Sequence, residues 1–312
     1  MPRTIHIGTR GSRLALWQAN WVKTALESGN RSLSAELVVI KTTGDKILDT
    51  PLAKVGGKGL FVKEIEAALL DGRIDVAVHS MKDMPAVIPE GLCIGAVPER
   101  ETPVDVLISK NGRQLAELET GARVGTGSLR RAAQLKHVRP DIVIVPLRGN
   151  LDTRLRKLET EHLDAIVLAA AGIKRLGFED RISEYLTESV MLPAVGQGAL
   201  CIETRENDSG TRDCVGALDH EKTRVTVMGE RAFLNRLEGS CQVPVAGFGR
   251  CDGNGYVLEG LVASIEGDTV IRDSLSGHMS ESEKIGVALA HRLLGRGAKK
   301  ILDLLKENAD EG

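Results

Sequence analysis

Aromatic residues are scarce in this chain of 312 residues, where Phe, Trp and Tyr together make up only 3%. The hydrophobic cores must therefore be built from Leu, Val, Ile and Ala. No apolar run approaches the roughly 20 residues that a membrane-spanning helix needs, and the N-terminus lacks the apolar core of a signal peptide. The net charge of −2 argues against a protein that holds nucleic acid by a global basic field. We therefore expect a soluble cytoplasmic protein without a membrane or nucleic-acid partner.

Cysteine is also rare, with five residues and no CxxC pair. This odd, sparse set predicts reduced thiols, with neither disulfides nor a metal site. Three cysteines are predicted to be buried small hydrophobes and one an incidental strand-end thiol: Cys93, Cys201, Cys214 and Cys251. Cys241 differs, because it follows a helical segment at 225–237 in the loop-like stretch "EGSCQVPV", where Gly239 is the expected helix stop. Only this thiol is placed for covalent chemistry.

Short β-rich runs alternate with amphipathic helical stretches over the first two thirds of the chain. This alternation predicts an α/β fold with parallel sheets and helices on both faces. The expected strands are Thr4–Gly8, Leu37–Lys41, Ile74–His79, Arg123–Thr126, Ile142–Leu147 and Ala165–Ala170. The expected helices are 13–27, 60–70, 129–138 and 151–160.

The chain is long enough for two or three domains, and Pro-containing passages at 98–109 and 192–203 interrupt the pattern. We expect two α/β lobes of the periplasmic-binding-protein kind, joined by two crossings with a cleft between them, plus a small α+β C-terminal domain. The predicted domains are 1–99 with 200–218, then 104–195, then 219–312. The last should contain strands near 243–250, 256–265 and 269–276 and one long helix from Glu281 to about Asn308.

A long segment at 42–59, "TTGDKILDTPLAKVGGKG", connects a predicted strand to a predicted helix. Loops of this length inside compact domains are often lids, and its glycine content supports that prediction. Its GGKG is not a phosphate-binding loop, because a glycine follows the lysine where Ser or Thr is required. "GTGS" at 125–128 lacks the third glycine of a dinucleotide-binding fingerprint.

Arginines gather where predicted strands end and helices begin. Cations near a helix N-terminus are disfavoured by the helix dipole, so their presence there indicates a bound anion. Free backbone N–H groups and forked guanidiniums suit carboxylates or phosphates. An ordinary surface role is about as plausible for any one of them, but not for the set: Arg10 and Arg13 around a Gly-Ser turn, Arg130 and Arg131 after the predicted N-cap Ser128, and Arg148 and Arg154.

The stretch "DVAVHSMKDMP" at 75–85 ends an apolar strand with charged residues. The residue before a proline, here Met84, is held extended, and we expect its neighbours to be extended as well. Adjacent side chains of an extended segment point to opposite sides, so Lys82 and Asp83 are expected to diverge. Asp83 is suited to acid–base work or to stabilising a cation, and Lys82 to binding an anion. The alternative is a solvated surface pair. His79 and Ser80 are expected to be hydrogen-bonding strand-end residues and not a catalytic pair.

Taken together, the motifs resemble the porphobilinogen deaminase (hydroxymethylbilane synthase) family over nearly the whole chain. They run from "GTRGSRLALWQA" through "KTTGDK", "KGLFVKEIE", "DVAVHSMKDMP", "GTGSLRR", "PLRGNLDTRLRKL", "AAAGIKRLG" and "LPAVGQGAL" to "ERAFLNRLEGSCQVPVA". The resemblance implies a monomeric transferase of tetrapyrrole (heme) biosynthesis. It condenses four porphobilinogen molecules head to tail, with loss of ammonia, into hydroxymethylbilane on a covalently bound dipyrromethane primer.

The resemblance also assigns roles to residues. It makes Asp83 the catalytic group and Cys241 the thioether attachment of the dipyrromethane cofactor. The cofactor-binding residues that it implies are Ser12, Lys82, Asp83, Ser128, Arg130, Arg131, Arg148 and Gly172. The implied substrate-binding residues are Arg10, Arg148, Arg154, Arg175, Gln197 and Phe61, the last as a stacking partner for a pyrrole. Arg13 and Gly127 depart from the common family pattern, which leaves their contact with ligand open, and Ser240 replaces a glycine.

Two other functions compete with this interpretation. An anion-binding solute- or effector-sensing module would explain the arginines, but not the loop thiol or the third domain. A thiol enzyme with Cys241 as a transient nucleophile would need a nearby base, and "EGSCQVPV" contains no histidine.

Overall fold

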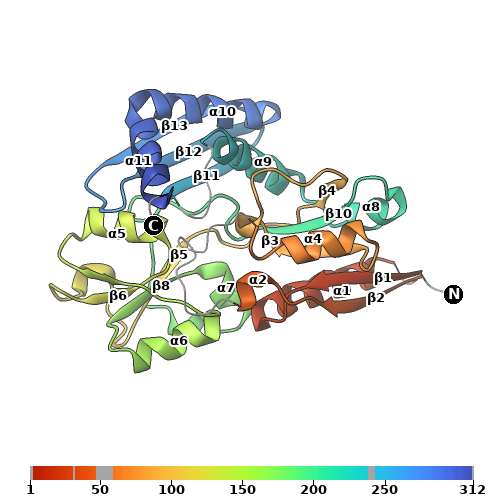
Figure 1. Cartoon of the computed structure of the whole chain (residues 1–312), viewed down its shortest axis with the longest axis horizontal. Helices are drawn as coiled ribbons and strands as arrows, with labels where there is room; N and C mark the ends of the chain where they lie inside the picture. Colours follow the sequence, from red (N-terminus) through yellow and green to blue (C-terminus); the bar gives the residue numbers. More distant parts are fainter. Residues whose placement is uncertain (1–2, 31, 47–58, 238–242, 311–312) are drawn as a thin grey trace. The chain divides into compact units, whose positions relative to one another are not determined.

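The computed structural model describes residues 3–30, 32–46, 59–237 and 243–310 (Figure 1). The described residues form two compact units. The first contains residues up to 46, 59–101 and 199–224, and the second contains 102–198 and 225–310.

The first unit is a five-stranded sheet with helices on both faces. Its strand order is β2-β1-β3-β10-β4, in which β1 runs parallel to β2 and β3, and β10 runs antiparallel to β3 and β4. Alternating residues of β3 face opposite ways, so Val78 packs with α1 and Ala77 packs with α4. The elements are β1 (Arg3–Thr9), α1 (Arg13–Gly29), β2 (Leu33–Val39), α2 (Thr43–Lys46), α4 (Lys63–Leu70), β3 (Val76–Ser80), β4 (Leu92–Ala96), β10 (Leu200–Arg205) and α8 (Ser209–Gly216).

The second unit begins with a similar sheet of order β7-β6-β8-β5-β9. Strand β6 is parallel to β7 and β8, whereas β5 is antiparallel to β8 and β9. Leu135 of α5 packs on one face and Leu158 of α6 on the other. The elements are β5 (Asp105–Ser109), β6 (Arg123–Gly125), α5 (Leu129–Val138), β7 (Val143–Val145), α6 (Leu151–Thr160), β8 (Ala165–Ala169), α7 (Ala170–Arg175) and β9 (Glu184–Tyr185).

The same unit contains a three-stranded antiparallel sheet, β11-β12-β13. Helix α10 covers one face of it (Figure 1), where Phe233 and Leu289 pack against Leu258. The other face brings Phe248 against Ala133 of α5. The elements are α9 (Glu221–Arg236), β11 (Val245–Asp252), β12 (Gly255–Ala263), β13 (Val270–His278), α10 (Ser282–Leu293) and α11 (Lys299–Asp310).

The predicted α/β class, the two lobes and the small C-terminal sheet with helices are confirmed. The prediction of purely parallel sheets is wrong. Strand β5 lies inside the passage at 98–109 and β10 begins inside the passage at 192–203, although both passages were predicted to be crossings, and both strands run antiparallel to their neighbours. Each is the first strand after the chain passes from one unit to the other. The direction of each strand in its sheet depends on how the chain enters the unit after this passage, and no local sequence pattern encodes that.

The predicted long C-terminal helix is also wrong, because it consists of two helices, α10 and α11. Gly297 interrupts them with φ of 108°, a left-handed conformation that glycine adopts without a steric cost. By contrast, α5 and α6 occupy the residues predicted for them.

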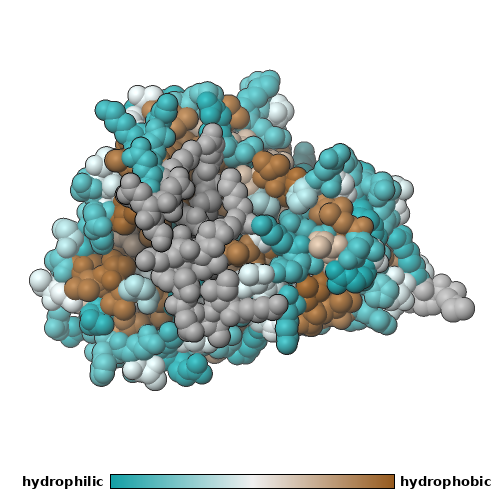
Figure 2. All heavy atoms as spheres, viewed as in Figure 1, coloured by the Kyte–Doolittle hydropathy of each residue, from teal (hydrophilic) through white to brown (hydrophobic). Residues whose placement is uncertain are grey.

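Hydrophilic side chains cover much of the face shown in Figure 2, where apolar side chains form separate groups. Among the described residues, no helix combines the length and apolar character needed to cross a membrane.

Candidate functional site

Two parallel strands of the first unit end beside one another and place a pocket at their carboxyl ends. Strand β1 leads into a Gly-Ser turn, where Ser12 Oγ accepts a hydrogen bond from Ala15 N at 3.3 Å and caps α1. The neighbouring strand β3 leads into Lys82 and Asp83. The carboxyl ends of parallel strands are the usual ligand-binding edge of such sheets.

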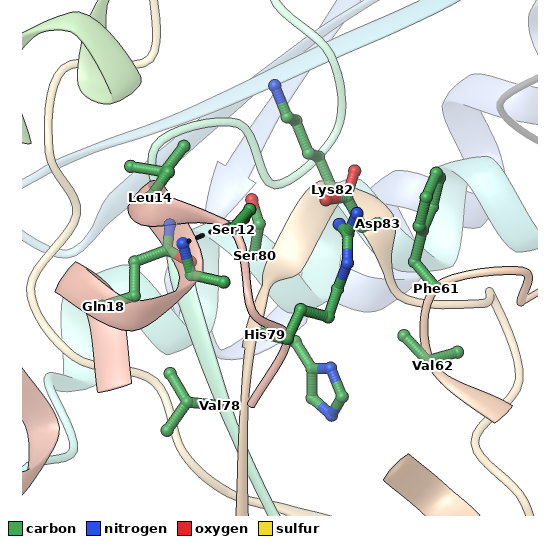
Figure 3. A pocket seen from close by; sticks show the side chains of 12 residues that line it. Ser12, Leu14, Gln18, Phe61, Val62, Val78, His79, Ser80, Lys82 and Asp83 are labelled. Carbon is green, nitrogen blue, oxygen red and sulfur yellow. Dashed lines mark hydrogen bonds between the residues drawn. The ribbon is translucent and has the colours of Figure 1, made fainter. Parts of the chain in front are cut away.

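The pocket collects five of the predicted site residues. They line it together with apolar and polar neighbours from α1 and β3 and with Val62, which directly precedes α4 (Figure 3). The five are Arg10, Ser12, Phe61, Lys82 and Asp83. In the same view the His79 ring points away from Asp83.

Lys82 and Asp83 are not extended, so their predicted divergence to opposite sides is wrong. They belong to a 3₁₀ turn over Met81–Asp83, and only Met84, before Pro85, has the predicted extended backbone (φ −70°, ψ 140°). Successive side chains of a 3₁₀ turn are about 120° apart. Both side chains therefore line the same pocket.

Arg10 is held by a partner that the sequence analysis did not select. Its Nε donates to Asp45 Oδ1 at 3.1 Å, and its guanidinium carbon lies 4.1 Å from the centre of the Phe61 ring. Burial would raise the pKa of Asp45, but hydrogen bonds from Arg10 and Thr42 lower it below its usual value. Phe61, predicted to stack on a pyrrole, is stacked by Arg10 here. The sequence feature that could have indicated this partner is Asp45, the acidic residue of "TTGDK".

A buried cluster of His79, Glu203 and Glu66 adjoins the pocket, which His79 itself helps to line. His79 Nε2 is 3.1 Å from Glu203 Oε2, with side chains 3% and 0% exposed, so the prediction of a hydrogen-bonding His79 is confirmed. Burial, and next the charge of Glu203, raise the pKa of Glu66 to about 7, against the opposing effects of His79 and Lys63. Within the described part of the chain, Oε1 of Glu66 and Oε1 of Glu203 accept no hydrogen bond.

The second unit holds the other arginine pair in its interior. Ser128 caps α5, as predicted, by accepting from Arg131 N at 3.5 Å. Arg131 donates from Nε to Asp105 Oδ1 at 3.0 Å and from Nη1 to Val167 O at 3.0 Å. Arg130 Nη1 lies 2.8 Å from Asp105 Oδ2 and donates to Leu192 O at 2.7 Å.

Asp105, at the start of β5, is the common partner that the sequence analysis missed. Burial by itself would raise the pKa of this fully enclosed carboxyl, but the charges of Arg130 and Arg131 outweigh it and hold the pKa at about 2. Gln197 Nε2 also donates to Asp105 Oδ1 at 2.9 Å and to Pro103 O at 2.6 Å. The available signal was an acid inside the apolar run "VDVLIS", since a buried charge requires partners.

The other predicted residues of this unit lie on α6 and α7 or, in the case of Arg148, just before α6. Arg154 Nε donates to Gly149 O at 2.8 Å beside the start of α6, and burial lowers the pKa of Arg148. Arg175 ends α7 and donates from Nη2 to Gly198 O at 2.7 Å. Gly172 is buried in α7.

Gly127 and Arg13 depart from the family pattern and are in different environments, whereas Ser240 lies outside the described residues. A Cβ atom at Gly127 would lie 2.6 Å from the backbone oxygen of Leu147, so a serine there requires the backbone to move. Arg13 opens α1 and is exposed.

The cysteine predictions are only partly tested. Cys241 lies outside the described residues, as do residues 47–58 of the predicted lid. Cys201 is buried as predicted, but Cys93 and Cys214 are half-buried, because β4 is an edge strand and α8 buries few of its residues. Cys251 is half-buried at the end of β11. In the described ranges, no group of three or more His, Cys, Asp or Glu side chains could hold a metal ion.

Comparisons with known proteins identify the family to which the whole chain is similar. The family "Porphobilinogen deaminase, dipyromethane cofactor binding domain" matches residues 5–213, and "Porphobilinogen deaminase, C-terminal domain" matches residues 224–295. The porphobilinogen deaminase of Geobacter metallireducens is 55% identical over 301 residues, which cover 96% of this chain and 94% of the relative. That of Carboxydothermus hydrogenoformans is 50% identical over 311 residues and the full length of both chains.

A solved structure of a probable amino-acid ABC transporter extracellular-binding protein from Bacillus subtilis is also similar. It covers 70% of this chain and 90% of its own, with a TM-score of 0.41 and 12% identity. The two family matches and the full-length relatives are decisive: the chain belongs to the porphobilinogen deaminase family.

Proposed function

We propose that this chain condenses four porphobilinogen molecules, with loss of ammonia, into hydroxymethylbilane on a dipyrromethane primer. The observation that carries the proposal is the match of residues 5–213 to a dipyrromethane cofactor-binding domain. That range contains both groups of buried or half-buried arginines described above. Membership of an enzyme family argues against the alternative, an anion-binding sensor module.

The donors of both units fit a ligand with several carboxylates. Each pyrrole of a dipyrromethane carries an acetate and a propionate. The first unit offers Arg10, Lys82 and Ser12 in one pocket. In the second unit, two guanidiniums against the single carboxylate of Asp105 leave a net charge of plus one, so the cluster still favours an anion. When bound, the dipyrromethane supplies the pyrrole position to which the first substrate is joined.

The residues that we propose to hold the cofactor are those that the family resemblance implies. Cys241, outside the described residues, provides the thioether. The polar and charged side chains and one backbone position that would bind it are Ser12, Lys82, Asp83, Ser128, Arg130, Arg131, Arg148 and Gly172.

Asp83 is the proposed catalytic residue. Ammonia leaves the aminomethyl group of the substrate with its bonding electrons, so positive charge develops on the pyrrole. A carboxylate at the end of β3, inside the pocket, stabilises that charge and accepts hydrogen bonds from pyrrole N–H groups. The same carboxylate helps to remove the final proton from the newly bonded ring.

Substrate carboxylates are proposed to bind residues that have replaceable partners. Arg10 and Asp45 are 25% and 28% exposed, and an ion pair that solvent reaches stabilises the fold only weakly. A substrate carboxylate can therefore take the place of Asp45, while Phe61 keeps the guanidinium in place or stacks on the pyrrole. The proposal also assigns substrate binding to Arg148, Arg154, Arg175 and Gln197, of which Gln197 differs from Arg10 because it is buried against Asp105.

We propose that the enzyme works as a cytoplasmic monomer. We also propose that it binds no nucleic acid, which its net charge of −2 supports. The proposed division is 1–99 with 200–218 as the first domain, 104–195 as the second, and 219–312 as the domain that carries the cofactor cysteine.

The test is the intact mass of the denatured protein, followed by peptide mapping around Cys241. We expect an excess equal to two condensed pyrrole units on that residue, and production of hydroxymethylbilane from added porphobilinogen. Cys241→Ser should lose both, whereas Cys251→Ser, a matched change at a half-buried cysteine of β11, should retain both. A bare mass that stays bare after incubation with porphobilinogen, with no product, would refute the proposal.

A further inference from the structure

Asp105 is the point on which three predicted ligand-binding side chains converge. Its Oδ1 accepts from Arg131 Nε at 3.0 Å and from Gln197 Nε2 at 2.9 Å, and its Oδ2 lies 2.8 Å from Arg130 Nη1. The three side chains come from α5 and from the segment before β10. No other carboxylate in the described part of the second unit contacts either arginine.

The geometry around Asp105 fixes the orientation of the arginines. Arg131 donates from Nε to Asp105 and from Nη1 to Val167 O, and its Nη2 is 2.8 Å from Asp105 Oδ1. Both arginine side chains are 5% exposed and Asp105 is 0% exposed. A guanidinium that is hydrogen-bonded on two sides is held in one plane, with its remaining N–H donors pointing in one direction. Little side-chain conformational entropy is therefore lost when a ligand binds.

We propose that Asp105 is a positioning residue that presents Arg130, Arg131 and Gln197 to the carboxylates of the ligand. The inference rests on the proposed function, since it assumes that this cluster binds the pyrrole carboxylates. Asp105 itself stays enclosed and acts only through its three partners.

A simpler role for Asp105 would be to neutralise charge, and the two roles predict opposite results. Asp105→Asn keeps the side-chain volume but removes one negative charge, which raises the net charge of the cluster and favours anions. The amide also replaces one acceptor oxygen by an NH₂ group, so one guanidinium loses its anchor. Neutralisation therefore predicts tighter ligand binding in the variant, and positioning predicts weaker binding.

The experiment compares wild type, Asp105→Asn and Asp75→Asn. Asp75→Asn is the matched control, because it removes a carboxylate that accepts from Arg205 Nη2 at 3.1 Å just before β3, outside the pocket lining. Intact mass gives the fraction of chains that carry the cofactor, and kinetics on the loaded fraction separate KM from kcat. For Asp105→Asn we expect cofactor occupancy to fall, or KM for porphobilinogen to rise, about tenfold with a smaller change in kcat; Asp75→Asn should match wild type.

Normal occupancy together with an unchanged or lower KM in folded Asp105→Asn would overturn the inference. If that variant does not fold, Asp105→Glu, which keeps the charge and displaces the carboxylate, decides by the same two measurements. If wild type carries no cofactor and forms no product, the proposed function fails separately. Thermal shifts with citrate, a polycarboxylate probe, then decide: weaker citrate binding in Asp105→Asn than in wild type supports positioning, and equal or absent binding overturns it.

Discussion

The two arginine groups of this protein use the same chemistry in opposite settings. Arg10 and Asp45 are 25% and 28% exposed, and the Arg10 guanidinium rests on the Phe61 ring. Arg131 and Asp105 are 5% and 0% exposed and are tied to the backbone and to Gln197. The difference comes from access to solvent. An exposed ion pair can exchange partners at little cost in free energy, whereas breaking a buried ion pair leaves a buried charge without a partner. The anion site proposed for the first unit is therefore adaptable, and the one proposed for the second unit is preformed.

Buried carboxylates extend the comparison. Asp105 and Glu66 are both buried, yet the pKa of Asp105 falls to about 2 while that of Glu66 rises to about 7. Burial acts in the same direction on both groups. The neighbours differ, because two guanidiniums flank Asp105 whereas the carboxylate of Glu203 lies near Glu66. The positive charges near Asp105 outweigh the effect of burial on its pKa, whereas the negative charge near Glu66 adds to that effect.

The largest expected effect is on turnover, from Asp83→Asn in the adaptable pocket. The change removes the charge that stabilises the developing cation but keeps the shape of the side chain. We expect the cofactor mass to be retained and kcat to fall by roughly 100-fold or more, with little change in thermal stability. Glu90→Gln, a change at an exposed acid of the same segment, is the control. Near-normal turnover in Asp83→Asn would remove Asp83 from the catalytic role.

The next effect is on stability, and it tests the contrast between the two arginine groups directly. Arg131→Met leaves Asp105 with one guanidinium fewer in a fully buried site, so the free energy of unfolding should fall by about 3 kcal/mol. Arg10→Met, the matched change in the half-exposed pair, should cost about 1 kcal/mol or less. Urea unfolding of both variants measures this. Equal losses would contradict the distinction between a preformed and an adaptable site.

The smallest effect is a pH dependence that isolates Glu66. Its pKa is raised from 4.5 to about 7 on folding, so the folded state binds more protons than the unfolded state between these values. The contribution of Glu66 to stability should therefore be greatest below about pH 4.5 and be lost as pH rises through 7. Glu203, His79 and Lys63 surround Glu66, so the measured quantity is the difference between wild type and Glu66→Gln. We expect wild type to lose about 2–3 kcal/mol relative to the variant from pH 5 to pH 8. A constant difference would show that Glu66 does not titrate in this range.

Much of the fold and part of the site follow from local patterns in the chain. Helices α5 and α6 match their predicted residues because amphipathic periodicity and the N-cap residues Ser128 and Asn150 are local signals. The convergence of Ser12, Lys82 and Asp83 also follows, since each comes directly after an apolar strand and parallel strands end at one edge. The family motifs are likewise readable in the order of the residues.

Only the tertiary structure decided which charges meet. Arg131 and Asp105 are 26 residues apart, Arg10 and Asp45 are 35 apart, and His79 and Glu203 are 124 apart. The antiparallel direction of β5 and β10 has the same origin, because each strand enters its sheet after a crossing. Periodicity and capping depend on residues a few positions apart, so the sequence reveals them directly. The pKa and the rigidity of a buried charge depend on neighbours brought together by folding, and these physical properties distinguish the two proposed anion sites.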